Sequence, residues 1–365
     1  MNRAYNDNRE YTDALDGLRF SDEAKARMVQ NLLDAAGENA PQQEKTRGRK
    51  SRLPRVAAVG VAAALVLGIG AGASGVFKTA GEAFSGVFGP TADTEIIDQI
   101  GRPIGASDTD NGVTITADAI IGDKYHYAIT YSIVKEDGTP FDIDLSKTVG
   151  DGVLPMNFAE EDTSLSGYFG GTHGGSYFYD ADPNDPSIQY VETREISEGD
   201  VHGRTVKAKF SDLYVYDEDM NRIMIAEGDW AFKFNMDFED TSINLPAGQT
   251  FGLNGMTATI DQITLSPLAL RVDYTVDSEV QWDENAQSGK QSDHDSAQMQ
   301  KYFDDVQILV NKADGTSVDM SYAGGSIKPQ GGKTVCQKGD IFSEIIPLED
   351  VVSLTIGDLE IPVQQ

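Results

Sequence analysis

The feature that most constrains this chain is an uncharged, largely apolar run of 22 residues from Val56 to Phe77. At about 1.5 Å per residue, a helix of this length covers roughly 33 Å, enough to cross a hydrocarbon core of about 30 Å. Six Lys and Arg residues lie within residues 45–55, opposed locally only by Glu44, and acid-rich sequence follows Lys78. Because basic flanks stay in the cytoplasm, the sequence predicts a single-pass protein of the cell membrane. Its N-terminus would be cytoplasmic and its C-terminus extracellular.

A cleaved signal peptide ending near Ala71-Gly72-Ala73 is a competing interpretation. It is disfavoured because the run exceeds a typical signal-peptide core and 55 residues precede it. Small residues recur every four positions in the run, at Gly60, Ala64, Gly68 and Gly72. Such a stripe lets two helices approach closely in the bilayer and would support a homodimer, although an Ala- and Gly-rich segment can also produce this spacing by chance.

Residues 20–36 predict an amphipathic helix on the cytoplasmic side. Ser21 is a suitable N-cap and Gly37 a suitable stop. One such helix cannot bury its own apolar face. We therefore expect it to lie on a partner protein, on its twin in a dimer or on the membrane surface; a loosely ordered tail is the alternative. The expected partner-binding residues are Met28, Val29, Leu32 and Leu33.

The sequence after Arg55 is strongly acidic, with 18 Lys and Arg against 50 Asp and Glu, a net charge of −32. A surface so negative repels phosphate backbones, which excludes nucleic acid as a partner of this region. The only cysteine, Cys336, cannot form an intramolecular disulfide and does not suffice for a cysteine zinc site. It is best interpreted as a small apolar strand residue.

The sequence outside the membrane is typical of β-strands. Trp230, Phe232, Phe234, Met236 and Phe238 alternate with mostly polar residues, as expected of a half-buried strand. Residues 113–117, 125–134 and 353–363 also predict strands. Phe77, Phe84 and Phe88 could share one face of a short helix next to the membrane, ending at Gly89-Pro90.

The outer region also contains an internal repeat. NGVTITADAIIGDKYHYAITYSIV (residues 111–134) aligns without gaps on NGMTATIDQITLSPLALRVDYTVD (residues 254–277), with seven of 24 positions identical. An Asp-Gly-Thr turn follows each copy. We therefore expect two related β-sandwich-like, immunoglobulin-like domains. The predicted segments are a cytoplasmic helix and basic tether, a transmembrane helix, a juxtamembrane segment and the two β domains, at residues 1–55, 56–77, 78–92, 93–245 and 246–365.

The sequence shows no catalytic constellation and no cofactor motif, so we expect a protein that is not an enzyme. His126, His173, His202 and His294 lie apart without a metal-ligand spacing, and surface or packing roles are expected for them. Residues 180–185 resemble the start of a calcium loop but lack its glycine and its final carboxylate. Asp217-Glu218-Asp219 is best explained as a solvated turn. The Gly- and Tyr-rich stretch 167–179 could be either a binding loop or a simple connection.

Three segments together resemble a known bacterial family: AKARMVQNLL, DNGVTITADAIIGDKYHYAITYSIVKEDG and GDWAFKFNMD. They are similar to segments of Gram-positive membrane proteins that carry domain of unknown function 4179, followed by a C-terminal immunoglobulin-like domain. The resemblance implies an anti-sigma-factor-like protein, whose cytoplasmic helix would hold an extracytoplasmic-function sigma factor. It implies no active-site residues, and the zinc-binding His/Cys motif of many anti-sigma domains is absent here.

Two hypotheses of function follow from the sequence. In the first, the chain is a membrane-anchored regulator of anti-sigma type, with outer β domains that sense an unknown signal. In the second, it is a cell-surface binding or structural module with no sigma-factor partner, and the bilayer serves only as its anchor.

Overall fold

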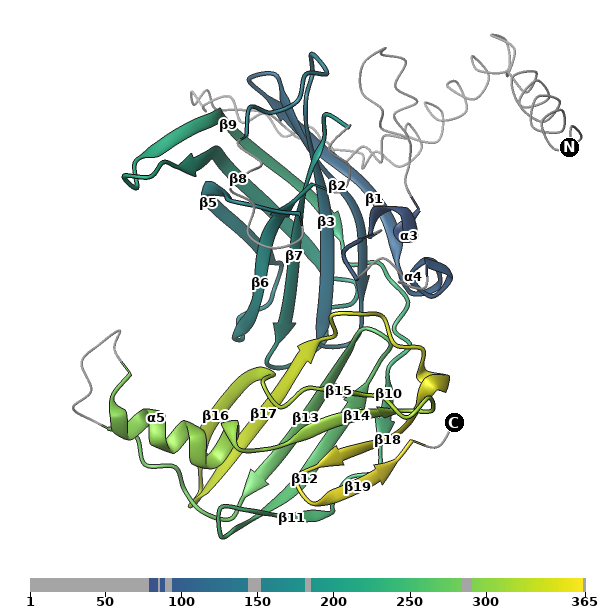
Figure 1. Ribbon diagram of the computed structural model, residues 1–365, viewed down its shortest axis with the longest axis vertical. Coiled ribbons are helices and arrows are strands. Elements are labelled where there is room, and N and C mark those ends of the chain that lie inside the picture. The colour runs from purple at the N-terminus through teal and green to yellow at the C-terminus, as the bar shows by residue number, and fades with distance from the viewer. Residues whose placement is uncertain are drawn as a thin grey trace, which may run out of the picture. The chain divides into compact units, whose positions relative to one another are not determined.

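The computed structural model describes residues 79–84, 86–88, 94–143, 152–180, 185–283 and 291–363. This part of the chain is mainly β, with several antiparallel sheets and few helices, which confirms the predicted fold class at that level (Figure 1). Within these ranges, no helix is long and apolar enough to cross a membrane. The predicted cytoplasmic helix and membrane span, with Met28, Val29, Leu32, Leu33, Gly60, Ala64, Gly68 and Gly72, lie outside the described residues.

The N-terminal half of the β region contains two antiparallel sheets. A six-stranded sheet has the order β1-β2-β3-β7-β6-β4, and a three-stranded sheet has the order β5-β8-β9. Both sheets contribute to one hydrophobic core, in which Trp230 and Tyr131 are among the largest fully buried side chains. The strands are β1 (Arg102–Asp110), β2 (Val113–Gly122), β3 (His126–Lys135), β4 (Val153–Leu154), β5 (Met156–Leu165), β6 (Thr172–Tyr179), β7 (Ile188–Ile196), β8 (Thr205–Tyr216) and β9 (Arg222–Asn235).

The C-terminal half also contains two antiparallel sheets around one core, separate from the first. The larger has the order β10-β12-β13-β17-β16, with β11 also paired to β12; the smaller has the order β15-β14-β18-β19. Its strands are β10 (Ile243–Leu245), β11 (Thr250–Leu253), β12 (Met256–Leu265), β13 (Ala269–Val276), β14 (Ile308–Lys312), β15 (Ser317–Asp319), β16 (Gly324–Gln330), β17 (Lys333–Ile341), β18 (Val351–Ile356) and β19 (Leu359–Pro362). Its helices are α5 (Asp293–Met299), the π-helical turn η2 (Gln300–Asp304) and the 3-10 turn η3 (Leu348–Asp350).

The alternating pattern in β9 has the predicted effect. Trp230, Phe232 and Phe234 are buried, and the residues between them are exposed. Cys336 is buried in β17, as expected of a small apolar strand residue. The predicted single strand 353–363 is wrong, because a turn at Gly357 (φ 59°) divides this segment into β18 and β19. The apolar pattern continues across the turn, so it did not reveal the reversal.

The two copies of the sequence repeat form matching hairpins, β2–β3 and β12–β13. Each hairpin is preceded by an Asn-Gly turn with positive φ at both residues: 46° and 77° at Asn111 and Gly112, 51° and 79° at Asn254 and Gly255. This is the conformation that Asn-Gly favours between antiparallel strands. The strand register also shifts at aligned positions, after Ala117 in one copy and after Ile260 in the other. The repeat is therefore structural as well as sequential.

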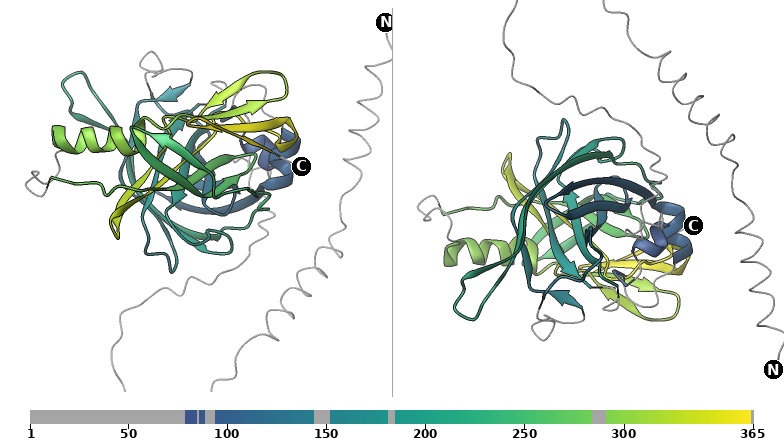
Figure 2. Two further views of the ribbon diagram at one scale, coloured as in Figure 1. Left: turned by 90° about the horizontal axis from the view of Figure 1, so that it is seen from below. Right: turned by 90° about the horizontal axis from the view of Figure 1, so that it is seen from above.

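Two short helices precede β1 and pack against each other (Figure 2). Helix α3 (Ala80–Ala83) begins at Thr79, whose hydroxyl accepts from the Glu82 amide while the Glu82 carboxylate accepts from the Thr79 amide. This reciprocal capping box satisfies two helix-end donors. The helix ends at Ala83, earlier than the predicted Gly89-Pro90. Phe84 and Phe88 are nevertheless buried and in ring contact at 5.7 Å, and α4 (Thr94–Ile100) follows.

Candidate functional site

The two halves meet where the paired hairpins turn. Asp123 begins the β2–β3 turn, and Ser266 occupies the aligned position in the second copy. Asp123 Oδ1 accepts from the amides of Tyr125 and His126, and Ser266 Oγ accepts from the amides of Leu268 and Ala269. Ser266 Oγ also donates to Asp123 Oδ2 at 2.7 Å, with both residues buried. Equivalent turns of the two repeats are thus joined directly.

Glu195 lies at the centre of a buried charge network beside this contact. In the six-stranded sheet, Glu195 of β7 stands opposite His126 of β3 on one side and His173 of β6 on the other. Cross-strand neighbours lie close enough for their side chains to interact. Glu195 Oε2 is 3.0 Å from His173 Nε2 and 3.4 Å from His126 Nε2. Both distances are short enough for an ion pair, but the angles do not meet those of a hydrogen bond.

Arg271, from β13 of the C-terminal half, completes the network from across the junction. Its Nη1 is 3.5 Å from Glu195 Oε1, and its guanidinium donates to the carbonyls of Ile196 and Ser197 at 2.8 and 2.9 Å. Its Nε pairs with Asp273 at 2.9 Å, and its plane lies 4.0 Å from the centre of the Tyr125 ring. Arg is suited to such a buried position, because its planar guanidinium presents several N–H donors in a fixed geometry.

Gly339 of β17 makes room for this packing. A Cβ atom there would lie 2.9 Å from the carbonyl oxygen of Leu270 and 3.1 Å from Glu195 Oε2. Beside His126, His173 and Glu195, a cavity of about 10 Å³ leaves space for about one water molecule. The junction is therefore closely packed around its charges.

The charged side chains of the junction favour one another's ionised forms, as the direction of their pKa shifts indicates. Burial alone would raise the pKa of Asp123 and lower that of His126. Their mutual attraction and hydrogen bonding outweigh it, lowering the pKa of Asp123 and raising that of His126 to about 10. Burial would also raise the pKa of Glu195, but its contacts with His126 and His173 lower it to about 2. The contact with Glu195 raises the pKa of His173. His126, His173 and Arg271 thus lie against the carboxylates of Asp123, Glu195 and Asp273.

The segment that follows the predicted membrane span is packed into this same junction. Phe84, Phe88 and Ile97 share a core cluster with Ala119, Ile121 and Ala128 of the N-terminal half and with Leu268, Ala269 and Ile345 of the C-terminal half. Phe84 and Ile97 are fully buried. The first described residues of the chain therefore belong to a core to which both halves contribute.

A second buried carboxylate lies inside the N-terminal half. Glu192 of β7 is fully buried, accepts from Tyr131 and Thr163, and lies 3.2 Å from Arg194 Nε. Burial raises the pKa of Glu192 to about 7, despite the opposing effects of Arg194 and Thr163.

Sequence reasoning missed the junction. His126 and His173, which we expected in unrelated packing or surface roles, meet at Glu195, and neither Glu195 nor Arg271 was singled out. The available signal was local: Asp123 stands three residues before His126, a spacing that lets an Asp side chain accept amides in a turn. His202 and His294 are exposed and do not join the network. Asp217 accepts from the amides of Asp219 and Asn221, as in the expected turn.

In the described ranges, no group of three or more His, Cys, Asp or Glu side chains has an arrangement that could hold a metal ion. Most of the Gly- and Tyr-rich stretch 167–179 belongs to β6, and Phe169 in the preceding loop is almost fully exposed. The acidic segment 180–185 lies mostly outside the described residues.

Part of this chain is similar to a described family. Residues 49–135 match the model of Domain of unknown function (DUF4179). The match ends with β3, so it covers the predicted span, α3, α4 and the first hairpin of the repeat. A solved structure described as the conserved domain protein from Bacillus anthracis is similar at 15% identity and a TM-score of 0.41, covering 70% of this chain and 75% of that chain. This likeness is too weak to support an assignment. No curated protein matches the sequence.

Proposed function

We propose that the chain is a single-pass membrane regulator of anti-sigma type. Its two β halves, which we take to be immunoglobulin-like, sense a signal outside the cell, and its cytoplasmic helix holds an extracytoplasmic-function sigma factor. The regulator itself is not an enzyme and needs no cofactor. The bilayer contacts residues 56–77, and the stripe Gly60, Ala64, Gly68 and Gly72 pairs two copies.

The observation that carries this proposal is the core that α3 and Phe84 share with residues of both halves. The chain leaves the predicted span and enters this core almost at once. A ligand that changed how the halves meet would therefore act on the residues next to the membrane. Coupling of this kind requires a contiguous element that both sites bias, and in this proposal the shared core is that element.

The proposed topology can be tested by cysteine labelling in intact cells, because the only native cysteine is buried. We would compare Ser21→Cys with Asp219→Cys, using a thiol reagent that does not cross membranes. The proposal expects labelling of Asp219→Cys in intact cells and of Ser21→Cys only after lysis. Labelling of Ser21→Cys in intact cells would contradict it.

The proposed partner can be tested by purifying the full chain from its source cell with its bound proteins. We expect a sigma factor to co-purify with the wild type and to be lost when Leu32 and Leu33 are both changed to Asp. The matched control carries Asp at two positions of the predicted basic tether, Gln42 and Gln43. A sigma factor that stayed bound to the Leu32→Asp/Leu33→Asp variant would exclude this helix as its site. Its absence from the wild type would favour the anchored surface module instead.

A further inference from the structure

β9 is an edge strand of the three-stranded sheet. β9 pairs with β8 on one side, and within the described ranges no strand pairs with its other side. Towards its end this edge is covered by carboxylates from β1: Asp110 accepts from the Asp229 amide at 2.9 Å, and Asp108 from the Ala231 amide at 2.8 Å. In the earlier stretch, 222–227, the Asn111 side chain donates to the Glu227 carbonyl at 3.3 Å.

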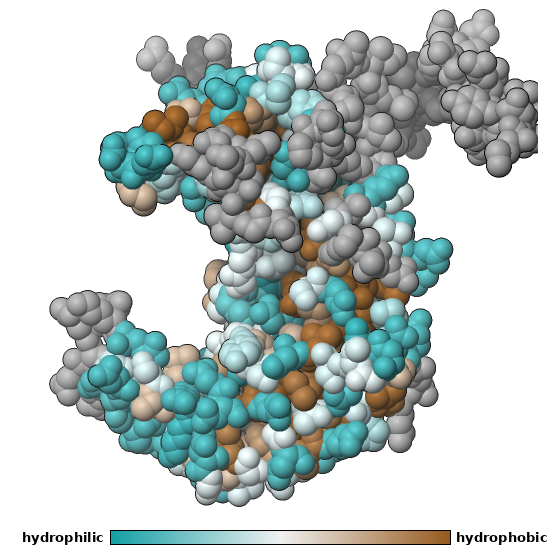
Figure 3. Space-filling view, in the orientation of Figure 1, coloured by the Kyte–Doolittle hydropathy of each residue, from teal (hydrophilic) through white to brown (hydrophobic). Residues whose placement is uncertain are grey.

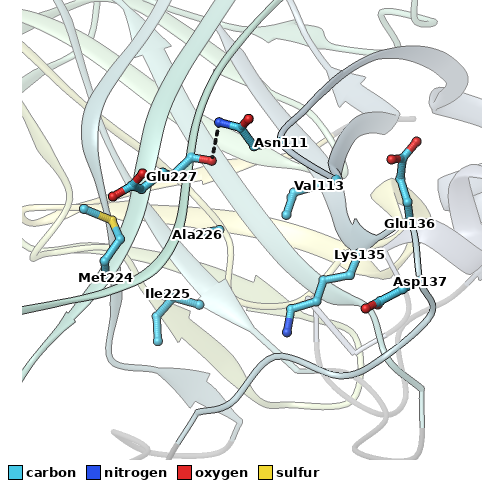
Figure 4. Close-up of a pocket in the computed structure, with 10 residues that line it drawn as sticks. Asn111, Val113, Lys135, Glu136, Asp137, Met224, Ile225, Ala226 and Glu227 are labelled. Carbon is cyan, nitrogen blue, oxygen red and sulfur yellow. Dashed lines mark hydrogen bonds between the residues drawn. The ribbon is translucent and has the colours of Figure 1, made fainter.

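An open cleft of about 700 Å³ runs beside this uncovered stretch (Figure 4). Met224, Ile225 and Ala226 of β9 line one side of it. The Asn-Gly turn before β2 and the end of β3 line the other. Native edge strands are usually covered or carry charges that prevent pairing. Here the edge instead exposes apolar side chains, with Ile223 at 47% and Met224 at 45%. Figure 3 shows apolar surface over this part of the β8–β9 hairpin.

The charges that line the cleft are mainly negative. Its lining contains three carboxylates, Glu136, Asp137 and Glu227, and one cation, Lys135. The Lys135 ammonium already donates to the Pro140 carbonyl at 3.1 Å and lies 5.1 Å from the centre of the Phe141 ring. The cleft therefore offers carboxylates beside apolar side chains of β9, a strand whose outer edge pairs with no other strand in the described ranges.

We propose that the β9 edge at residues 222–227 binds an extended cationic polypeptide, in which Lys or Arg alternates with apolar residues. Such a segment adds a strand to the sheet: its backbone pairs with β9, and its side chains alternate between two faces. Its apolar face covers Ile225 and Ala226, and its basic face meets Glu136 and Glu227.

A second copy of this chain fits the same edge poorly. Pairing two β9 edges would bring their acidic rims together, and like charges in close apposition oppose association. The basic segment 45–55 of this chain has the right charge, but it lies on the other side of the predicted membrane span. The charge of the cleft thus favours an external cationic segment. This assignment rests on the proposed outward orientation of the β halves and gives the proposed sensor a ligand class.

The test uses the full chain in nanodiscs of zwitterionic lipid, with a labelled peptide of about ten residues that alternates Lys and Val. Binding is followed by fluorescence anisotropy. We expect Glu136→Lys combined with Glu227→Lys to weaken binding at least about tenfold, because two attractive pairs become repulsive. The matched control is Glu160→Lys combined with Asp162→Lys, which makes the same charge change on β5, the opposite edge of the same sheet. The control should bind within about twofold of the wild type.

Several results would overturn this proposal. They are the absence of peptide binding, equal weakening by both double variants, or equally tight binding of a peptide that alternates Ser and Val. Hydrogen exchange supplies an independent readout, because a bound strand must slow exchange of amides within residues 222–227. Binding without that protection would place the peptide elsewhere. Peptide binding that left the sigma factor in place would contradict the proposed regulation while leaving the binding site intact.

Discussion

At the scale of single residues, the junction shows how a buried charge is tolerated. Glu195 is surrounded by His126, His173 and Arg271, which belong to three different strands. Removing one member of a buried ionic network leaves the others uncompensated, which is typically more costly than never having built the network. Substitutions in this junction that keep the size of a side chain but remove its charge should therefore lower the stability of the protein.

Glu195→Gln tests this sensitivity. We expect it to lower the free energy of unfolding by about 3 kcal/mol at pH 7, because His126, His173 and Arg271 lose their shared carboxylate. Urea unfolding monitored by Trp fluorescence measures the change. Glu198→Gln, three residues away and exposed, is the control and should stay within about 0.5 kcal/mol of the wild type. Equal stability of the two variants would mean that the network contributes nothing.

The pH dependence of stability should separate the two buried networks. For His126, whose folded pKa of about 10 exceeds the ordinary value of 6.5, the stabilisation is complete below pH 6.5 and disappears as pH rises through 10. For Glu195, whose pKa falls from 4.5 to about 2, the stabilisation is present above pH 4.5 and is lost as pH falls towards 2.

Glu192 behaves in the opposite sense, because its pKa rises from 4.5 to about 7. Its favourable contribution is complete below pH 4.5 and declines as pH rises through 7, by on the order of 3 kcal/mol. We expect Glu192→Gln to flatten the stability profile between pH 4.5 and 7, measured by urea unfolding at several pH values. Glu160→Gln, which is exposed on β5, should retain the wild-type slope. A wild-type slope in Glu192→Gln would assign the effect to another group.

At the scale of elements, the repeated hairpins share their turn, their register shift and a polar residue that caps the following amides. The turns rely on glycine because Gly112 and Gly255 adopt φ values of 77° and 79°. Apart from the neighbouring residues of the chain, no atom lies within 4 Å of a Cβ built at either position. A larger residue would therefore meet no steric clash, and only the left-handed backbone conformation would disfavour it. The two turns should therefore respond alike to the same substitution.

Gly112→Ala and Gly255→Ala should each lower the free energy of unfolding by about 1–2 kcal/mol, the cost of a left-handed conformation for an L-residue. Gly175→Ala is the matched control, because this position is equally open and does not have a left-handed φ. It should be neutral or slightly stabilising. Thermal unfolding of the three variants gives the comparison, and unequal costs at the two turns would show that the repeats differ in local strain.

At the scale of the whole described region, the halves are joined both by polar contacts and by the core that includes α3 and α4. Phe84 is fully buried in that core, whereas Val87 lies only partly buried beside it. This arrangement makes the residues next to the predicted span part of the junction rather than a free linker.

Phe84→Ala should lower the free energy of unfolding by about 3–5 kcal/mol, since it removes a fully buried aromatic side chain and leaves a cavity. It should also speed hydrogen exchange in the turns around Asp123 and Ser266, because both halves pack on this core. Val87→Ala is the control, with a cost of about 1 kcal/mol and little effect on exchange at the junction. Faster exchange confined to α3 would show that the segment is not coupled to the halves.

The amino-acid sequence by itself predicted what depends on near neighbours: the strand of Trp230, Phe232 and Phe234, the Asp-Gly-Thr turn after each repeat copy and the mainly β fold. These features follow from periodicity and turn chemistry, which act over a few residues. It also predicted the membrane span, which lies outside the described residues. It missed the turn at Gly357, because the apolar pattern continues across it.

Only the tertiary structure decided the site. Asp123 and Ser266 are 143 residues apart, and Arg271 reaches the carbonyl of a residue 75 positions earlier. No local pattern encodes such contacts, because they depend on which strand edges pair and in which register. The same holds for β9: its alternation predicted a strand, but whether one edge would remain open depended on where β1 ended up. Burial then gave ordinary residues their altered chemistry, since the pKa values of His126 and Glu195 follow from neighbours brought together by folding.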